Sequence, residues 1–205
     1  MSGQLRPGTF IRQDRIAEEL QLSGTPVREG LMALRGEGFV VLKPRRGFVV
    51  APLSGRDIHD LFVAQALLAG ELAARATDEL DPAAIASLEE IDGDVNRAAA
   101  NGDVAEVERL NHEFHRFINL RADSARLSWM LSVSVRFAPR RFYATIPGWA
   151  EASARDHEAV LSAFRAGDAE AARTAMRTHV EHAGVLLAQH FDRPDNPAGT
   201  APTSG

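Results

Sequence analysis

Three histidines and one asparagine have the side-chain types and the helical spacing of a metal site. Asn111 and His115 stand four residues apart in a helix-periodic segment, so both side chains project from its apolar face. His157 and His179 fall on the apolar stripes of two later segments. Three neutral imidazoles and one amide oxygen suit a divalent first-row ion such as zinc, nickel or manganese. The spacing therefore predicts a metal centre at Asn111, His115, His157 and His179.

Other readings of these histidines remain open at this point. A single histidine on an apolar face is more often a hydrogen-bonded core residue than a ligand. A metal ion held by three histidines, with open coordination positions, could bind a small carboxylate, could be purely structural, or could activate water in a hydrolytic enzyme. The enzyme needs a carboxylate facing the ion, and Glu113 and Glu158 are expected to point away from their neighbouring histidines. We therefore expect a binding site and not an enzyme.

The elements that must position these residues are helices. Residues 53–191 have almost no strand character, and they are rich in alanine and leucine at helical spacing. Asp-Pro and Gly-Asp pairs separate the periodic segments. The pattern predicts an all-α bundle of about six helices, at residues 58–76, 82–100, 104–120, 125–144, 152–166 and 169–191.

The segment from residue 125 to 144 also holds a group of arginines. Arg136, Arg140 and Arg141 lie in one polar stretch of an otherwise apolar segment. An arginine turned inward would bind a carboxylate through two parallel hydrogen bonds. A solvated basic patch interrupted by Pro139 is an equally good reading of the stretch.

The first fifty residues have a different pattern, typical of a helix-turn-helix. A helix-periodic segment from Ile16 runs into Ser23, which can cap a second helix, and Pro26 stands where its missing N–H costs nothing. Val27, Leu31 and Leu34 are expected to point inward from this second helix.

The exposed residues of the helix-turn-helix are suited to DNA. A recognition helix contacts base edges with its N-terminal residues. Two runs rich in β-branched residues follow, 39–43 and 47–51, and two arginines stand at the turn between them. Such a hairpin predicts a wing that lies on the DNA backbone or in a minor groove. The predicted DNA contacts are Ser23, Thr25, Arg28, Arg45, Arg46 and Gly47.

The N-terminal run resembles the winged helix-turn-helix of the GntR family of bacterial transcription regulators. The order L-x-P-G, S-x-T-P-V-R-E, L-x-x-L, E-G and R-G-F-x-V is matched from Leu5 to Val50. The resemblance implies the same DNA contacts, except that Gly24 stands where the family usually has an arginine. The family usually has a further helix before the L-x-P-G turn, so we expect that the first helix is missing and that Met1 is not the native start.

The later segments resemble the FCD domain of the FadR-like branch of that family. The motifs are N-x-x-F-H, then D-H-E-A-V-L, then A-x-x-x-M-x-x-H. The resemblance implies metal ligation by His115, His157 and His179, whereas Asn111 stands where many such domains have aspartate. Where the family often has an arginine in its first bundle helix, this chain has Gln65. The candidate effector contacts are Gln65, Arg136 and Arg140.

Composition limits the remaining choices. Residues 1–52 carry eight Lys and Arg against five Asp and Glu, whereas the other residues carry fifteen against twenty-three. The basic surplus therefore lies where DNA is expected. The absence of cysteine excludes disulfides and thiolate metal sites. No run approaches the roughly 18 apolar residues of a membrane span, so a cytoplasmic protein without a membrane partner is expected.

The sequence thus predicts a mainly α protein in three parts. Residues 1–52 form a winged helix-turn-helix, 53–191 an FCD-like effector-binding and dimerisation domain, and 192–205 a disordered tail. We expect a homodimeric, ligand-responsive transcription regulator that acts as a repressor. It would bind an inverted-repeat DNA operator and sense a small carboxylate through the metal site.

Overall fold

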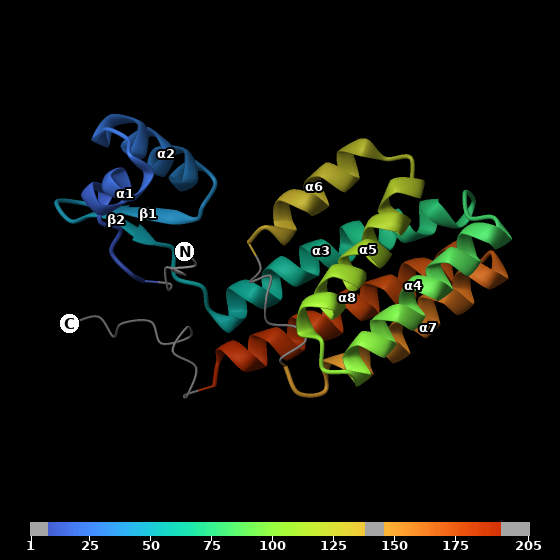
Figure 1. The fold of residues 1–205 in the computed structure, drawn as a ribbon. Coiled ribbons are helices and arrows are strands. Elements are labelled where there is room, and N and C mark those ends of the chain that lie inside the picture. The colour runs from blue at the N-terminus through green and yellow to red at the C-terminus, as the bar shows by residue number, and fades with distance from the viewer. Residues whose placement is uncertain (1–7, 138–145, 194–205) are drawn as a thin grey trace. The chain divides into compact units, whose positions relative to one another are not determined.

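The computed structural model describes residues 8–137 and 146–193 (Figure 1). The fold is mainly α with one small hairpin, as the sequence predicts. The chain separates into two compact units, Met1–Ser54 together with the residues from Phe191 on, and Gly55–His190. The tail expected to be disordered lies outside the described residues from residue 194 on.

The first unit is a winged helix-turn-helix. Helices α1 (Gln13–Leu20) and α2 (Gly24–Gly36) precede an antiparallel hairpin of β1 (Val40–Lys43) and β2 (Gly47–Val50). In the hairpin, Val41 pairs with Val49 and Leu42 with Phe48. One small core joins the two helices to the hairpin, and it contains Ile11, Val27, Leu31, Val40 and Phe48.

One local expectation for α2 was wrong, and a second was met only in part. Leu34 is 40% exposed, although it was expected to point inward. The elements packed on α2 are α1 and β1, and they cover its Val27 and Leu31 face and not the side on which Leu34 lies. Ser23 stands at the N-cap position, but its side chain accepts no hydrogen bond from the helix.

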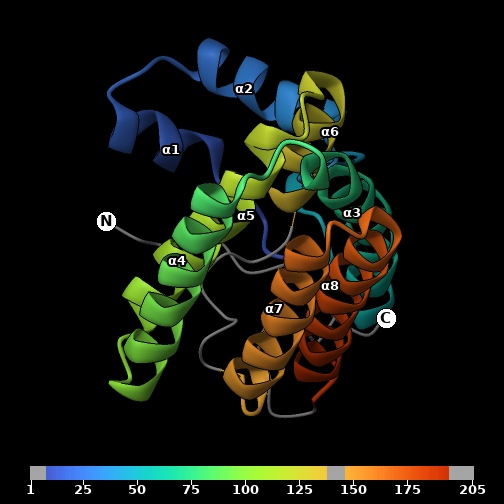
Figure 2. The same cartoon turned by 90° about the vertical axis from the view of Figure 1, so that its right-hand side faces the viewer.

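The second unit is an all-α bundle. Its helices are α3 (Gly55–Thr77), α4 (Pro82–Ala100), α5 (Val104–Arg121), α6 (Ala125–Val135), α7 (Trp149–Ala166) and α8 (Ala169–Phe191). Asp81 and Asp103 cap α4 and α5 through their carboxylates, and Gly167 ends α7 with a positive φ. Figure 2 shows α7 beside α8 and α4 beside α5. The central core includes Leu72, Leu88, Phe114, Val160 and Met176.

One helix is shorter than the sequence predicts. Helix α6 was expected to extend to residue 144, but it ends at Val135. Pro139 follows four residues later, and a proline ring is incompatible with a helix interior. Residues 138–145 lie outside the described residues.

Two glycines allow α3 and α8 to approach closely. A Cβ added at Gly70 of α3 would lie 2.5 Å from Cγ of Arg177, and one added at Gly184 of α8 would lie 2.4 Å from Cβ of Phe62. Both distances are shorter than non-bonded carbon atoms tolerate. The antiparallel contact between α3 and α8 therefore depends on the absence of side chains at these two positions.

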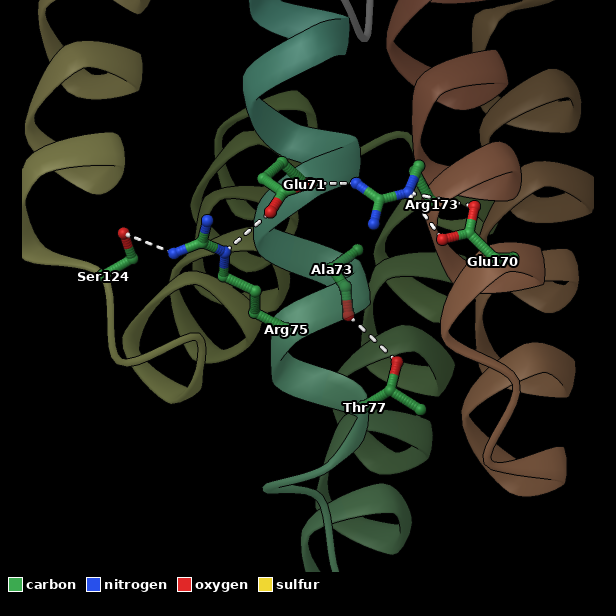
Figure 3. A network of polar contacts seen from close by, with 7 residues as sticks. All are labelled: Glu71, Ala73, Arg75, Thr77, Ser124, Glu170 and Arg173. Carbon is green, nitrogen blue, oxygen red and sulfur yellow. Dashed lines mark hydrogen bonds and ion pairs between the residues drawn. The ribbon is translucent and has the colours of Figure 1, made fainter.

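A polar network reinforces the same contact (Figure 3). Glu71 of α3 pairs with Arg173 of α8, and Glu71 also accepts a 2.7 Å hydrogen bond from Arg75. Arg75 reaches Ser124, the N-cap residue of α6, at 3.5 Å, and Arg173 also pairs with Glu170. These contacts connect α3 with α8 and with the start of α6.

Among the described residues, no helix is both long and apolar enough to cross a lipid bilayer.

Candidate functional site

Three histidines from three helices meet inside the bundle. His115 lies on α5, His157 on α7 and His179 on α8, and one ring nitrogen of each lies within 4.8 Å of the others. Nε2 of His115 and Nε2 of His179 are 3.1 Å apart. His157 stacks on Phe114 with ring centroids 4.1 Å apart, which fixes the plane of its imidazole. The structure therefore brings together the three histidines that the sequence singled out.

His157 is held by a carboxylate from a fourth helix. Oδ1 of Asp92, on α4, lies 2.6 Å from Nδ1 of His157, and Oδ2 of Asp92 accepts a 3.1 Å hydrogen bond from Asn96. His157 is fully buried, and its Nε2 atom has no hydrogen-bond partner. The ring is thus anchored on one side, and its second nitrogen remains available on the other.

His179 has a carboxylate neighbour as well. Oδ2 of Asp156, on α7, lies 3.7 Å from Nδ1 of His179 and 2.9 Å from Nδ1 of His182. The first distance is too long for a hydrogen bond, whereas the second is a normal one. His182 is exposed, but its contact with Asp156 links it to the cluster.

The histidine cluster favours neutral imidazoles. Burial lowers the pKa of His115 well below its usual value, and the neighbouring His179 and His157 lower it further. Burial also lowers the pKa of His179 to about 4, against the opposing effect of Asp156. Burial raises the pKa of Asp156, but its contacts with His179 and His182 outweigh this, so the pKa lies below its usual value. Neutral imidazole is the form that ligates metal ions.

Asn111 is the fourth predicted ligand. It lies on α5, one turn before His115, and its Oδ1 atom is buried without a hydrogen-bond partner. A buried polar atom without a partner is costly unless something outside the protein satisfies it. Oδ1 of Asn111 and Nε2 of His157 are two such atoms, and each can donate a lone pair to a divalent cation, the imidazole nitrogen more strongly than the amide oxygen. The residues present therefore fit a metal ion.

Sequence reasoning missed the two carboxylates beside the histidines. Asp92 is buried on the α4 face that also buries Leu88 and Val95. That spacing was a usable signal, because an aspartate on an apolar helical stripe needs a partner. Asp156 stands next to His157 in sequence but contacts His179 and His182, which only the packing of α7 on α8 reveals.

The candidate effector residues that the structure describes differ in their burial. Gln65 is buried, and its Nε2 atom donates a 3.2 Å hydrogen bond to the carbonyl oxygen of Ser134 on α6. Arg136 is exposed at the C-terminal end of α6. Arg140 and Arg141 lie outside the described residues.

The glutamates next to the histidines do not face the cluster. Glu113 is exposed and pairs with Arg109 at 2.7 Å, and Glu158 is exposed and pairs with Arg165 at 2.9 Å. Both glutamates therefore point away from the histidines, as their positions in the sequence predicted.

The predicted DNA contacts lie on exposed parts of the first unit. Thr25 and Arg28 line a shallow depression on α2 together with Gly24, Glu29 and Met32. Arg45 and Arg46 occupy the tip of the hairpin, where Arg45 has a φ of 61° and Gly47 a φ of 86°. The described residues provide no ion-pair partner for Arg28, Arg45 or Arg46, so these three cations are available to phosphates or bases.

Two family models match the chain, one in each unit. Residues 60–182 match the FCD domain, and residues 1–50 match the gntR family of bacterial regulatory proteins. The chain is 26% identical over 195 residues to the HTH-type transcriptional regulator McbR of Escherichia coli, covering 93% of this chain and 88% of that protein. It is 28% identical over 184 residues to the "probable D-xylose utilization operon transcriptional repressor" of Paenarthrobacter nicotinovorans, covering 87% and 79%.

A solved structure shares the fold over almost the whole chain. The structure of E. coli McbR/YncC has a TM-score of 0.71 and 25% sequence identity, and the match covers 93% of this chain and 92% of that one. The likeness thus includes both the helix-turn-helix unit and the helical bundle.

Proposed function

The chain belongs to the FCD-containing gntR family of bacterial regulatory proteins, and we propose that it responds to a small carboxylic acid bound at a metal ion. The family and its relatives are DNA-binding transcription regulators and not enzymes, and so is this protein. The observation that carries the proposal is the meeting of three imidazoles from α5, α7 and α8 within 4.8 Å, two of them buried and that of His115 half-buried.

The donor set supports a divalent transition-metal ion. His115, His157 and His179 would supply three imidazole nitrogens, and Asn111 an amide oxygen. The ion would be zinc, nickel or manganese, since imidazole and oxygen donors accommodate all three and the chain has no thiolate. An amide oxygen is a weak ligand, so positions remain open for the carboxylate of an effector. When bound, the ion supplies a positive charge that attracts this carboxylate.

The acid would also need contacts from the protein. We propose Gln65 and the arginines Arg136 and Arg140 as candidates. Gln65 is supported by its burial in α3. An arginine would contribute a bidentate contact with the carboxylate.

DNA would be read by the first unit. Ser23, Thr25 and Arg28 of the α2 region would contact base edges or phosphates, and Arg45, Arg46 and Gly47 of the wing would contact the backbone or a minor groove. A homodimer would place two such units on an inverted-repeat operator in the cytoplasm. Repression is supported by the name of the Paenarthrobacter relative.

The first experiment measures metal. Protein purified without chelator is expected to contain about one divalent ion per chain by elemental analysis, and His157→Ala is expected to lose it. His112→Ala is the matched control, because His112 is an exposed histidine on α5. Equal metal contents in the wild type and in His157→Ala would contradict the site.

The second experiment asks whether the metal serves sensing. A panel of small carboxylic acids is screened by thermal shift with and without added zinc, since a ligand that binds the folded state raises Tm by mass action. We expect at least one acid to raise Tm only when zinc is present, and to change operator affinity. If no acid in the panel changes Tm or operator affinity, the ion is structural.

A further inference from the structure

Asp92 has a position unusual for a carboxylate. Among the described residues, it is the one aspartate or glutamate counted as buried, with 8% of its surface exposed. It comes from α4, a helix that contributes no histidine to the cluster. Its Oδ1 atom lies 2.6 Å from Nδ1 of His157, and its Oδ2 atom is 3.1 Å from Nδ2 of Asn96.

The contact with Asp92 decides which nitrogen of His157 carries hydrogen. An ionised carboxylate only accepts hydrogen bonds, so the 2.6 Å contact requires a hydrogen on Nδ1 of His157. In a neutral imidazole the other nitrogen then presents a lone pair. That atom, Nε2, is buried without a hydrogen-bond partner. The lone pair is therefore buried and unpaired, on a ring whose centroid lies 4.7 Å from that of His179 and 5.7 Å from that of His115.

Asp92 also contributes a negative charge beside the proposed metal centre. The proposed ligands, three imidazoles and the amide of Asn111, are all neutral, so a bound divalent ion would leave a double positive charge in the protein interior. Burying uncompensated charge is expensive. Asp92 is the carboxylate that reaches the ligand His157 directly, and Asp156 lies 3.7 Å from Nδ1 of His179. A carboxylate behind a ligating histidine raises the basicity of that ligand and orients its ring.

We propose that Asp92 is the positioning carboxylate of the metal centre, holding His157 with Nε2 toward the ion and providing the negative charge that Asn111 does not. This inference rests on the metal site proposed above. It assigns a role to α4, which supplies no ligand, and it explains why an aspartate interrupts the apolar face between Leu88 and Val95.

The test compares the zinc affinities of full-length variants by competition with a chromogenic chelator. Asp92→Asn keeps the shape of the side chain and removes its charge, and it is expected to weaken zinc binding roughly 10–100-fold. Asp94→Asn is the matched control, because Asp94 lies on the same helix and pairs with the exposed Arg97. This control is expected to bind zinc as the wild type does.

A rescue experiment separates the loss of charge from general damage. Asn111→Asp in the Asp92→Asn background returns one negative charge to the centre, now on a ligand, and is expected to recover at least tenfold in zinc affinity. The absence of any recovery would contradict the charge part of the proposal.

A measurement on the unmodified protein does not depend on the folding of any variant. Nitrogen-15 NMR of the metal-free wild type is expected to show His157 with its hydrogen on Nδ1. A hydrogen on Nε2 would overturn the proposal. The proposal would also be overturned if Asp92→Asn bound zinc within threefold of the wild-type affinity while His157→Ala lost zinc. That result would contradict the role of Asp92 but not the metal site itself. A wild-type chain that does not bind zinc would overturn both.

Discussion

Nε2 of His115 and Nε2 of His179 lie 3.1 Å apart, although the two residues are 64 positions apart in the sequence. At this distance one nitrogen must carry hydrogen and the other must accept it, so two protonated rings are incompatible with the contact. The lowered pKa values of both histidines agree with this. A divalent ion bound here would be held by His115 and His179 as neutral rings, the hydrogen on Nε2 of one ring having moved to its Nδ1.

Protonation of these histidines should destabilise the metal-free bundle. The pKa of His179 is about 4 in the folded protein and about 6.5 in an unfolded chain, so the unfolded state binds more protons between these values. The contribution of each such imidazole to the free energy of unfolding is therefore fully present above pH 6.5. It falls as the pH is lowered toward 4, by at most about 1.4 kcal/mol per pH unit. Chelator-treated protein is expected to lose Tm steadily over this window. A Tm that stays constant from pH 7 to 4.5 would contradict it.

Arg28→Ala should weaken binding to operator DNA. Arg28 is exposed near the N-terminal end of α2 and has no ion-pair partner in the described part of the chain. If its guanidinium contacts a base edge, the loss is about 1–3 kcal/mol, and discrimination at one base pair decreases. The measurement is fluorescence anisotropy with a duplex selected by the full chain from random DNA. Arg35→Ala, in the last turn of the same helix, serves as control, and an equal loss in both variants would argue against base reading by Arg28.

Gly24→Arg should strengthen DNA binding. A Cβ added at Gly24 meets no atom within 4 Å, so a side chain can leave the backbone there without a clash. One added phosphate contact makes the slope of log affinity against log salt steeper by about 0.9. Gly24→Gln, of similar length and neutral, controls for the gain in helix propensity. The same salt slope in both variants would show that residue 24 does not reach a phosphate.

Gly184→Ala should destabilise the helical bundle. The new methyl group would lie 2.4 Å from Cβ of Phe62, and both atoms are attached to helix backbones that cannot shift independently. Overpacking of this kind costs about 1–3 kcal/mol. Urea unfolding is expected to show a lower midpoint for this variant.

The control for Gly184→Ala is Gly93→Ala. At Gly93 of α4, the nearest atom to an added Cβ is the flexible end of Arg97, 3.4 Å away. Alanine there should leave the unfolding midpoint unchanged or raise it, because alanine favours helix by about 1 kcal/mol over glycine. Equal effects at the two positions would mean that α3 and α8 do not approach as closely as described.

The sequence by itself determined the local features of this protein. Helical spacing placed Asn111, His115, His157 and His179 on apolar faces, and the order of motifs around Ser23 and Arg28 specified a helix-turn-helix with a wing. These features depend on residues within a few turns of one another, and side-chain direction in a helix follows from position alone.

Only the tertiary structure decided which faces meet. Periodicity predicted that Leu34 points inward, but no element in the described part of the chain buries it, and α6 ended before the predicted boundary. The pairing of Asp92 with His157 joins residues 65 positions apart, and the meeting of Gly184 with Phe62 joins two helices at opposite ends of the bundle's sequence. A helical pattern shows that a face is buried but not what it is buried against, because that depends on how all the helices pack together.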